Sequence, residues 1–270
     1  MMKFLIIITG ALLILGCSDK TADAISDPSI KTEEVEYSAD GTILKGFLAY
    51  DENIEGKRPG ILVVHEWWGH NEYARKRAVM LAELGYIALA VDMYGNGKQA
   101  NHPEDAQKFA MEVFTNLDEA KNRFAAAYDF LAEQQETDKN NIGAIGYCFG
   151  GGVVLHMARF GFDLKGVASF HGALQTQVPA EPNTVKAELL VCNGADDKMV
   201  TAEQVENFKK EMDAAGVKYK LINYPGAMHS FTNPIADSVG KKFDMPLAYN
   251  KEADEKSWQE LKEFFKRVFK

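Results

Sequence analysis

The chain has 270 residues, of which 46% are hydrophobic and 26% are charged. These values are ordinary for a globular protein with a large core, and they exclude a disordered or proline-rich chain. The formal net charge of −9 at pH 7 argues against a nucleic-acid partner, because binding to a phosphate backbone requires a basic surface.

The first residues have the pattern of a targeting signal. Lys3 precedes an apolar run at residues 4–15, which is too short to span a bilayer but suits the core of a signal peptide. Cys17 follows this run, and the segment resembles the lipobox of bacterial lipoproteins, in which the cysteine is lipidated. We therefore predict a signal peptide at residues 1–16, lipidation at Cys17 and a flexible tether at residues 17–31. The alternative is a secretory signal with an incidental cysteine.

The three cysteines bear on location and redox state. A lipidated Cys17 predicts a membrane partner through the lipid anchor and a place in the bacterial cell envelope, at the outer membrane or facing the periplasm. Ser18 favours the outer membrane by analogy with lipoprotein sorting. In such an oxidising compartment Cys148 and Cys192 could form a disulfide, although nothing in their settings indicates one. Cys192, at the end of an apolar run, is typical of a core residue.

From residue 32 to 270 the predicted elements alternate between strands and helices. Short runs on either side of a turn signal at residues 39–41 predict an antiparallel hairpin. Further apolar runs predict strands at residues 61–64, 86–91, 142–147, 166–171, 189–192 and 217–224. Helical periodicity predicts helices at residues 73–84, 103–131 (with a break near 115–116), 150–160, 202–215 and 253–269. The two long segments left irregular are residues 94–103 and 230–250.

This alternation predicts one α/β domain at residues 32–270. Its central sheet should be mainly parallel, with helices on both faces and the antiparallel hairpin at the N-terminal side. No composition shift inside the range indicates a second domain. The long irregular segments are expected above the sheet, where such loops shape binding sites.

The run Gly146-Tyr-Cys-Phe-Gly150 is the strongest chemical signal, because it lies between a predicted strand and a predicted helix. A nucleophile elbow has this setting: a tight turn lifts one side chain above the sheet, and glycines are needed where backbones come close. The helix that follows would favour a thiolate at Cys148. The alternative is a glycine-rich turn with a buried cysteine. A dinucleotide site is a weaker rival, because the glycine spacing does not fit.

Two later residues complete a catalytic set. Asp197 follows the strand that ends at Cys192, and His229 follows the next strand. The order nucleophile, acid, histidine is that of α/β-hydrolases, and adjacent parallel strands bring their C-terminal ends to one edge. A single histidine is more often solvated or packed than catalytic, so His229 is favoured by its position relative to the other two residues.

The chain resembles the dienelactone hydrolase family over about residues 32–270, and this resemblance implies an α/β-hydrolase fold. The matching motifs are His65-Glu-Trp-Trp-Gly69, Asp92-Met-Tyr94, Gly146-Tyr-Cys-Phe-Gly-Gly151, Ser169-Phe-His-Gly172, Gly194-Ala-Asp-Asp197 and His229-Ser-Phe231. The resemblance implies Cys148 as nucleophile, His229 as base and Asp197 as the acid that orients the histidine. Asp196 fits the family pattern less well than Asp197.

The resemblance also implies roles for residues around the nucleophile. Glu66 matches a family glutamate that contacts the nucleophile and moves when substrate binds, so it is expected to modulate Cys148 by like-charge repulsion. The alternative is a strand-end acid that faces solvent. Backbone N–H groups of Phe149 and Trp67 are the expected oxyanion donors.

The chain departs from the family where substrate is recognised. Family members that act on dienelactone hold its carboxylate with arginines, but the segment after Tyr94 offers only Lys98, and Thr232-Asn233 stands after the His-Ser-Phe triplet. The predicted substrate is therefore another small ester or lactone. Trp68, Tyr94, Lys98 and Phe231, with Trp67 and Phe149, are candidates for an aromatic-lined pocket, although the aromatic members could equally belong to the core.

The leading hypothesis is a carboxylic-ester, lactone or thioester hydrolase that works through an acyl-enzyme. The alternative is a surface lipoprotein that binds a ligand on a hydrolase scaffold without turnover. The histidines at 65, 70, 171 and 229 lack paired-ligand spacing, so no metal or other cofactor is predicted. A monomer is favoured, although the sequence does not determine the oligomeric state.

Overall fold

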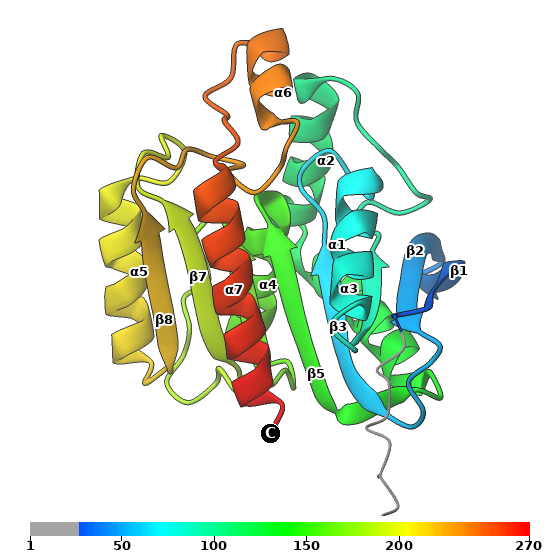
Figure 1. Cartoon of the computed structure of the whole chain (residues 1–270). Coiled ribbons are helices and arrows are strands. Elements are labelled where there is room, and N and C mark those ends of the chain that lie inside the picture. The colour runs from blue at the N-terminus through cyan, green and yellow to red at the C-terminus, as the bar shows by residue number, and fades with distance from the viewer. Residues whose placement is uncertain (1–26) are drawn as a thin grey trace, which may run out of the picture.

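The computed structural model describes residues 27–270, so the predicted signal peptide, Cys17 and most of the predicted tether lie outside the described residues. An eight-stranded sheet runs through this part of the chain in the order β1-β2-β4-β3-β5-β6-β7-β8 (Figure 1). Its strands are β1 (Ile30–Ala39), β2 (Thr42–Asp51), β3 (Arg58–Val64), β4 (Ile87–Val91), β5 (Thr137–Tyr147), β6 (Gly166–Phe170), β7 (Glu188–Gly194) and β8 (Tyr219–Tyr224).

The pairing of the strands confirms the predicted fold class. Strand β1 pairs antiparallel with β2, and β2 pairs antiparallel with β4. The pairs from β4 through β8 are all parallel, so their C-terminal ends meet at one edge of the sheet. Strand β1 begins at Ile30, two residues before the predicted start of the domain.

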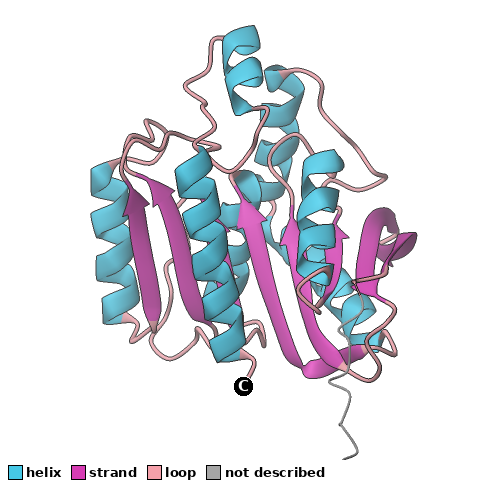
Figure 2. Ribbon diagram, viewed as in Figure 1, coloured by secondary structure: helices cyan, strands magenta, loops and turns pink. Residues whose placement is uncertain are grey.

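Helices cover both faces of the sheet (Figure 2). They are α1 (Glu72–Ala82), α2 (Pro103–Thr115), α3 (Leu117–Glu133), α4 (Phe149–Arg159), α5 (Ala202–Ala214), α6 (Ala236–Phe243) and α7 (Lys251–Val268). Helices α1 and α7 pack on one face, whereas α2 to α5 pack on the other.

Strand β3 shows how the sequence produces this two-sided core. Leu62 and Val64 enter one hydrophobic cluster, and Ile61 and Val63 enter the cluster on the other face. Successive side chains of a strand point to opposite faces, so a strand covered on both sides must be apolar throughout. The continuous apolar run in the sequence is the direct result.

One helical prediction was right and one was wrong in part. The predicted break near residues 115–116 is confirmed: Asn116 ends α2 and caps α3, and its side chain accepts a hydrogen bond from the Glu119 amide. The segment 230–250 was expected to be irregular, and this was wrong in part, because it contains α6. Helix α6 has only eight residues, which is too short to give a clear periodic signal.

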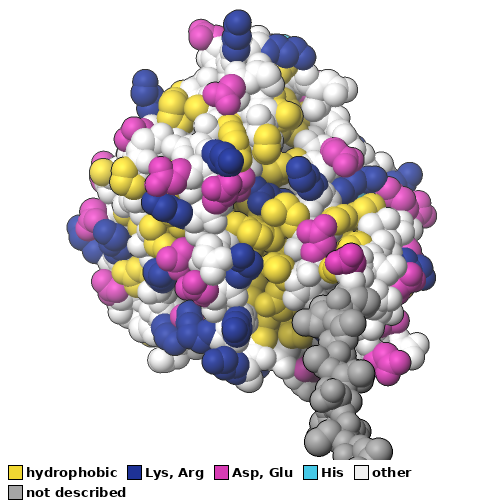
Figure 3. Space-filling model, in the orientation of Figure 1, with side chains coloured by type: hydrophobic (Ala, Val, Ile, Leu, Met, Phe, Trp, Pro, Cys, Tyr) yellow, Lys and Arg dark blue, Asp and Glu magenta, His cyan; other side chains and the backbone are white. Residues whose placement is uncertain are grey.

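The surface over α1 and α7 carries charges of both signs, with hydrophobic side chains exposed between the two helices (Figure 3). Within residues 27–270, no helix is both long and apolar enough to cross a membrane. Cys148 and Cys192 are both free thiols.

Candidate active site

The turn between β5 and α4 carries Cys148 in a conformation that few side chains adopt, with φ 52° and ψ −113°. A Cβ atom at Gly146 would lie 2.1 Å from the Gly150 carbonyl oxygen, and one at Gly150 would lie 2.3 Å from the Val64 oxygen. These distances are far below van der Waals contact, so both positions require glycine. The turn thereby projects the thiol above the sheet, at the C-terminal edge of the strands.

Three side chains meet above this edge. His229 Nε2 lies 3.1 Å from Cys148 Sγ, and His229 Nδ1 lies 2.8 Å from Asp197 Oδ2. Asp197 is buried and also accepts a hydrogen bond from the Met199 amide at 2.7 Å, whereas Asp196 is exposed. The structure therefore brings together the three residues that the sequence singled out, with Asp197 rather than Asp196 beside the histidine.

The charge state of His229 follows from these contacts. Burial alone would lower the pKa of its imidazole, but the Cys148 thiolate and the hydrogen bond to Asp197 outweigh burial and raise the pKa to about 10. A histidine held in this way keeps a proton at neutral pH, which suits a thiolate–imidazolium pair.

Glu66 follows β3 and is buried, with 2% of its surface exposed. It was expected to contact Cys148. Instead, its carboxylate oxygens accept hydrogen bonds from Ser230 Oγ at 3.1 Å and Asn233 Nδ2 at 2.6 Å. Burial raises the pKa of Glu66, and the bonds from Asn233 and Ser230 oppose that rise. Sequence reasoning missed Ser230 and Asn233 as partners of this acid, although both lie close to His229 in the chain.

The expected oxyanion donors are the amides of Phe149 and Trp67. Phe149 is the first residue of α4, where backbone N–H groups have no partner within the helix. Among the described residues, neither amide donates to another backbone group. The N-terminus of α4 also favours a negative charge beside the Phe149 amide.

The aromatic candidates fall into two groups. Phe231 is fully buried in the core, and Tyr94 is buried with its hydroxyl donating to the Trp67 carbonyl at 2.9 Å. In contrast, Trp67 and Trp68 are half-buried, with ring centroids 5.1 Å apart. Trp68 stacks on Phe243 of α6 at 5.9 Å. We call Trp67, Trp68 and Phe243 the aromatic wall.

The remaining candidates contribute less to the site. Lys98 is exposed, and its Nζ lies 5.7 Å from the centre of the Phe109 ring. No group of three or more potential metal ligands occurs among residues 27–270. Cys192 is buried in β7, and burial raises the pKa of its thiol to about 12, as expected for an unreactive core residue.

Comparisons with known proteins point in one direction. The profile described as "Dienelactone hydrolase family" matches residues 44–269. Protein usf of Aquifex pyrophilus is 30% identical over 211 residues, which cover 76% of this chain and 89% of that protein. The crystal structure of a dienelactone hydrolase-like promiscuous phosphotriesterase from metagenomic libraries is 33% identical, with a TM-score of 0.84, and covers 89% of this chain and 99% of its own. The structure named m3DLH is 35% identical, with a TM-score of 0.85 and the same two coverages, 89% and 99%.

Proposed function

The chain belongs to the dienelactone hydrolase family, and we propose that it cleaves a carboxylic ester or a related acyl bond through an acyl-enzyme on Cys148. The observation that carries this proposal is the position of His229, which lies within hydrogen-bond distance of both Cys148 Sγ and Asp197 Oδ2. A nucleophile, a proton carrier and a group that orients the carrier are the parts that acyl transfer requires.

The first half of the reaction forms a thioester. The Cys148 thiolate attacks the carbonyl carbon of the substrate, and the carbonyl oxygen takes up the electron pair while the amides of Phe149 and Trp67 donate to it. His229 then gives its proton to the leaving alcohol oxygen as the carbon–oxygen bond breaks. Asp197 keeps the imidazole aligned throughout this transfer.

The second half returns the enzyme to its starting state. Neutral His229 takes a proton from water, and the resulting hydroxide attacks the thioester carbon. Cys148 leaves as a thiolate beside the reformed imidazolium, and the carboxylic acid product departs.

The surroundings of the site favour a substrate without a carboxylate. Thr232-Asn233 stands where dienelactone-cleaving relatives are expected to have an arginine, and the Asn233 side chain donates its amide to buried Glu66. Lys98 is exposed and lies against an aromatic ring. Neither of these two positions, both within residues 27–270, supplies a bidentate clamp for a carboxylate, and the aromatic wall suits an uncharged acyl or alcohol group.

Glu66 and Cys17 complete the proposal. We propose that Glu66 affects the nucleophile indirectly, through Ser230 next to His229, because its hydrogen bonds go to Ser230 and Asn233.

We also propose that Cys17 is lipidated and anchors the protein in the bacterial cell envelope. This part rests on the sequence pattern alone.

The decisive experiment compares Cys148→Ala with Cys192→Ala. Each variant is assayed on p-nitrophenyl esters, thioesters, lactones and phosphotriesters, the last because a similar protein is a promiscuous phosphotriesterase. We expect Cys148→Ala to abolish hydrolysis and Cys192→Ala to retain it. In parallel, mass spectrometry should detect transient acylation of the wild-type protein at Cys148. Full activity of Cys148→Ala would refute the proposal, and ligand binding without acylation would favour a non-catalytic lipoprotein.

A further inference from the structure

His171 directly follows β6, and its side chain accepts a hydrogen bond from the backbone of Cys148. The Cys148 amide donates to His171 Nδ1 at 3.1 Å, in addition to the Phe170 carbonyl oxygen at 3.0 Å. On the other side of the ring, His171 Nε2 lies 2.8 Å from Thr232 Oγ1. Thr232 is three residues beyond His229, so one imidazole joins the nucleophile turn to the segment that carries the catalytic histidine.

These contacts determine the tautomer of His171. A backbone amide always donates, so Nδ1 must act as acceptor without a hydrogen. The hydrogen of the neutral ring is then on Nε2 and points at the Thr232 hydroxyl oxygen. A proton on Nδ1 would break the bond to Cys148.

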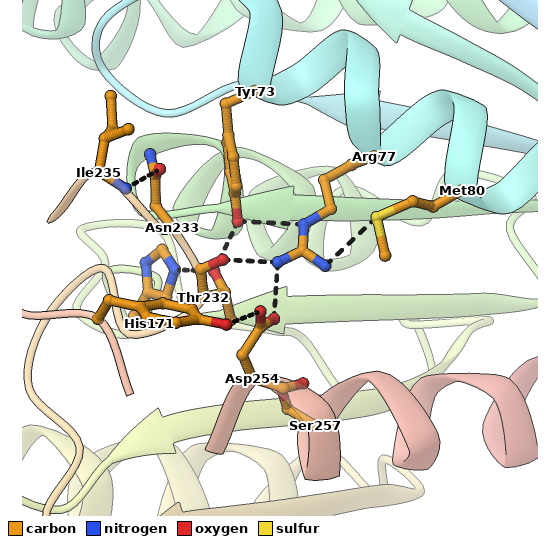
Figure 4. A network of polar contacts seen from close by, with 10 residues as sticks. Tyr73, Arg77, Met80, His171, Thr232, Asn233, Ile235, Asp254 and Ser257 are labelled. Carbon is orange, nitrogen blue, oxygen red and sulfur yellow. Dashed lines mark hydrogen bonds and ion pairs between the residues drawn. The ribbon is translucent and has the colours of Figure 1, made fainter. Parts of the chain in front are cut away.

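Thr232 continues the contact chain into the two helices on the same face of the sheet (Figure 4). Its hydroxyl lies 2.6 Å from the Tyr73 hydroxyl on α1, and Arg77 Nη2 donates to its carbonyl oxygen at 2.6 Å. Arg77 Nη2 also pairs with Asp254 on α7 at 2.7 Å. Tyr73, Arg77, His171 and Thr232 are buried, and the Asp254 side chain is 16% exposed, so we expect these contacts to form a rigid support.

Backbone strain occurs at both ends of the bond between Cys148 and His171. His171 has φ 39° and Cys148 has φ 52°, in a region that side chains other than glycine seldom adopt. Such outliers persist only where surrounding contacts hold them, and they gather at functional sites. The bond that joins the two strained residues is one of these contacts.

The two neighbouring histidines differ in charge. The ring centroids of His171 and His229 are 5.3 Å apart. Burial and the charges of His229 and Arg77 hold the pKa of His171 well below its usual range, whereas the pKa of His229 is raised. His171 thus stays neutral beside an imidazolium and does not compete for the catalytic proton.

We propose that His171 is a positioning residue: its imidazole holds the Cys148 turn and the His229 segment in register, with Thr232 as the link to α1 and α7. This inference rests on the proposed acyl-transfer function. It predicts that the loss of either hydrogen bond lowers kcat more than it changes KM, because the ring contacts the catalytic residues and their supports.

The kinetic test uses two series of variants with p-nitrophenyl acetate as substrate. His171→Phe removes both hydrogen bonds, while His171→Asn keeps an acceptor near the position of Nδ1. Thr232→Val removes only the hydroxyl, and Thr232→Ser restores it. We expect His171→Phe to lower kcat about 10- to 100-fold with a nearly constant KM, His171→Asn and Thr232→Val to lose less, and Thr232→Ser to approach wild type.

His156→Asn is the matched control. His156 is also a buried histidine with contacts through both ring nitrogens, to the Gly152 carbonyl oxygen and to Thr176 Oγ1, but it does not touch Cys148, Asp197 or His229. Its replacement should leave kcat within about twofold of wild type. Thermal unfolding identifies any variant that fails to fold. If His171→Phe does not fold, the comparison of Thr232→Val with Thr232→Ser tests the role of His171.

Two measurements need no substrate and separate this inference from the proposed function. Nitrogen NMR of histidine-labelled protein should show His171 as the neutral tautomer with hydrogen on Nε2. Alkylation of Cys148 by iodoacetamide should slow in His171→Phe and Thr232→Val but not in Thr232→Ser. If the NMR and alkylation results are as expected but the protein hydrolyses no ester, only the proposed function is contradicted. Hydrogen on Nδ1, or unchanged kcat and alkylation in folded His171→Phe and Thr232→Val, would overturn the role of His171.

Discussion

The Cys148–Asp197–His229 set and the aromatic wall share one edge of the sheet but are held in different ways. Each residue of the set follows a strand and is fixed by short polar contacts, and the Cys148 turn also depends on backbone packing. The wall joins the segment after β3 to α6 through ring contacts between half-buried side chains. Ring contacts tolerate small shifts that short hydrogen bonds do not, so we expect the Cys148–Asp197–His229 set to be held more firmly than the aromatic wall.

After the loss of Cys148 itself, the largest effect should come from Asp197, the acid of the proposed triad. Asp197→Asn leaves the size of the side chain unchanged but removes the charge that orients His229 and stabilises its imidazolium. We expect kcat on an activated ester to fall about 10³- to 10⁴-fold with little change in KM, as for triads in general. Asp196→Asn is the matched control, because its exposed carboxylate lies one residue away and should be neutral. A loss below tenfold for Asp197→Asn would remove this residue from the mechanism.

The backbone of the turn should be nearly as sensitive. Gly150→Ala places a Cβ atom 2.3 Å from the Val64 carbonyl oxygen, so the turn must move and the thiol with it. We expect a loss of about 10²-fold or more in kcat/KM together with a lower Tm. Gly152→Ala is the control: its nearest contact would be 3.2 Å, to the Phe114 ring, and alanine favours the helix. Equal effects of the two variants would contradict the claim that the turn requires glycine at position 150 because of close backbone packing.

The aromatic wall should respond differently. Phe243→Ala removes the ring that stacks on Trp68 while leaving the triad intact. We expect KM and the ranking of ester substrates to change a few-fold, with kcat for a small acetate ester nearly constant. Ile235→Ala, an exposed position in the same segment, should change neither quantity. A large fall in kcat for the acetate would mean that the wall and the triad are coupled.

The smallest effect concerns stability and pH. Because the pKa of His229 is raised from 6.5 to about 10, its protonation stabilises the folded state fully below about pH 6.5, and this stabilisation is lost as the pH rises towards 10. Denaturant unfolding should therefore show a larger fall in the free energy of unfolding between pH 7 and pH 10 for wild type than for His229→Gln. His102→Gln, at an exposed histidine whose ring centroid lies 5.3 Å from that of Phe243, is the control and should show the wild-type slope. Identical slopes for all three proteins would contradict the raised pKa.

The sequence predicted those parts of the fold that depend on local pattern. The strands are continuous apolar runs because both faces of the sheet are covered, and Asn116 marks a helix break through its capping side chain. The nucleophile turn was predictable because its glycines are close in the chain and each serves a steric need. That Cys148, Asp197 and His229 lie together was predictable from strand order, since parallel strands align their C-terminal ends.

The rest depended on contacts between distant residues. Arg77 and Asp254 are 177 positions apart, and the bond of His171 to Thr232 spans 61. No periodic signal reports such pairs. The sequence predicted a role for Glu66, but its hydrogen-bond partners Ser230 and Asn233 lie more than 160 positions away and meet it only in the folded chain. Helix α6 was missed for the same reason, because packing rather than its eight-residue pattern specifies it.

The point where the chain enters the fold has a geometric consequence. Near residue 27, the Asn53 side chain donates to the Asp27 carbonyl oxygen, at the edge of the sheet where β3 begins. Cys148 and its partners lie beyond the opposite edge, about 20 Å away along seven residues of strand β3. The described domain thus has its first residues at one end of the parallel strands and the Cys148 thiol at the other end. A surface that holds the chain near residue 27 would therefore lie at the end of the sheet away from Cys148, so immobilisation there should not obstruct the access of small molecules to the thiol.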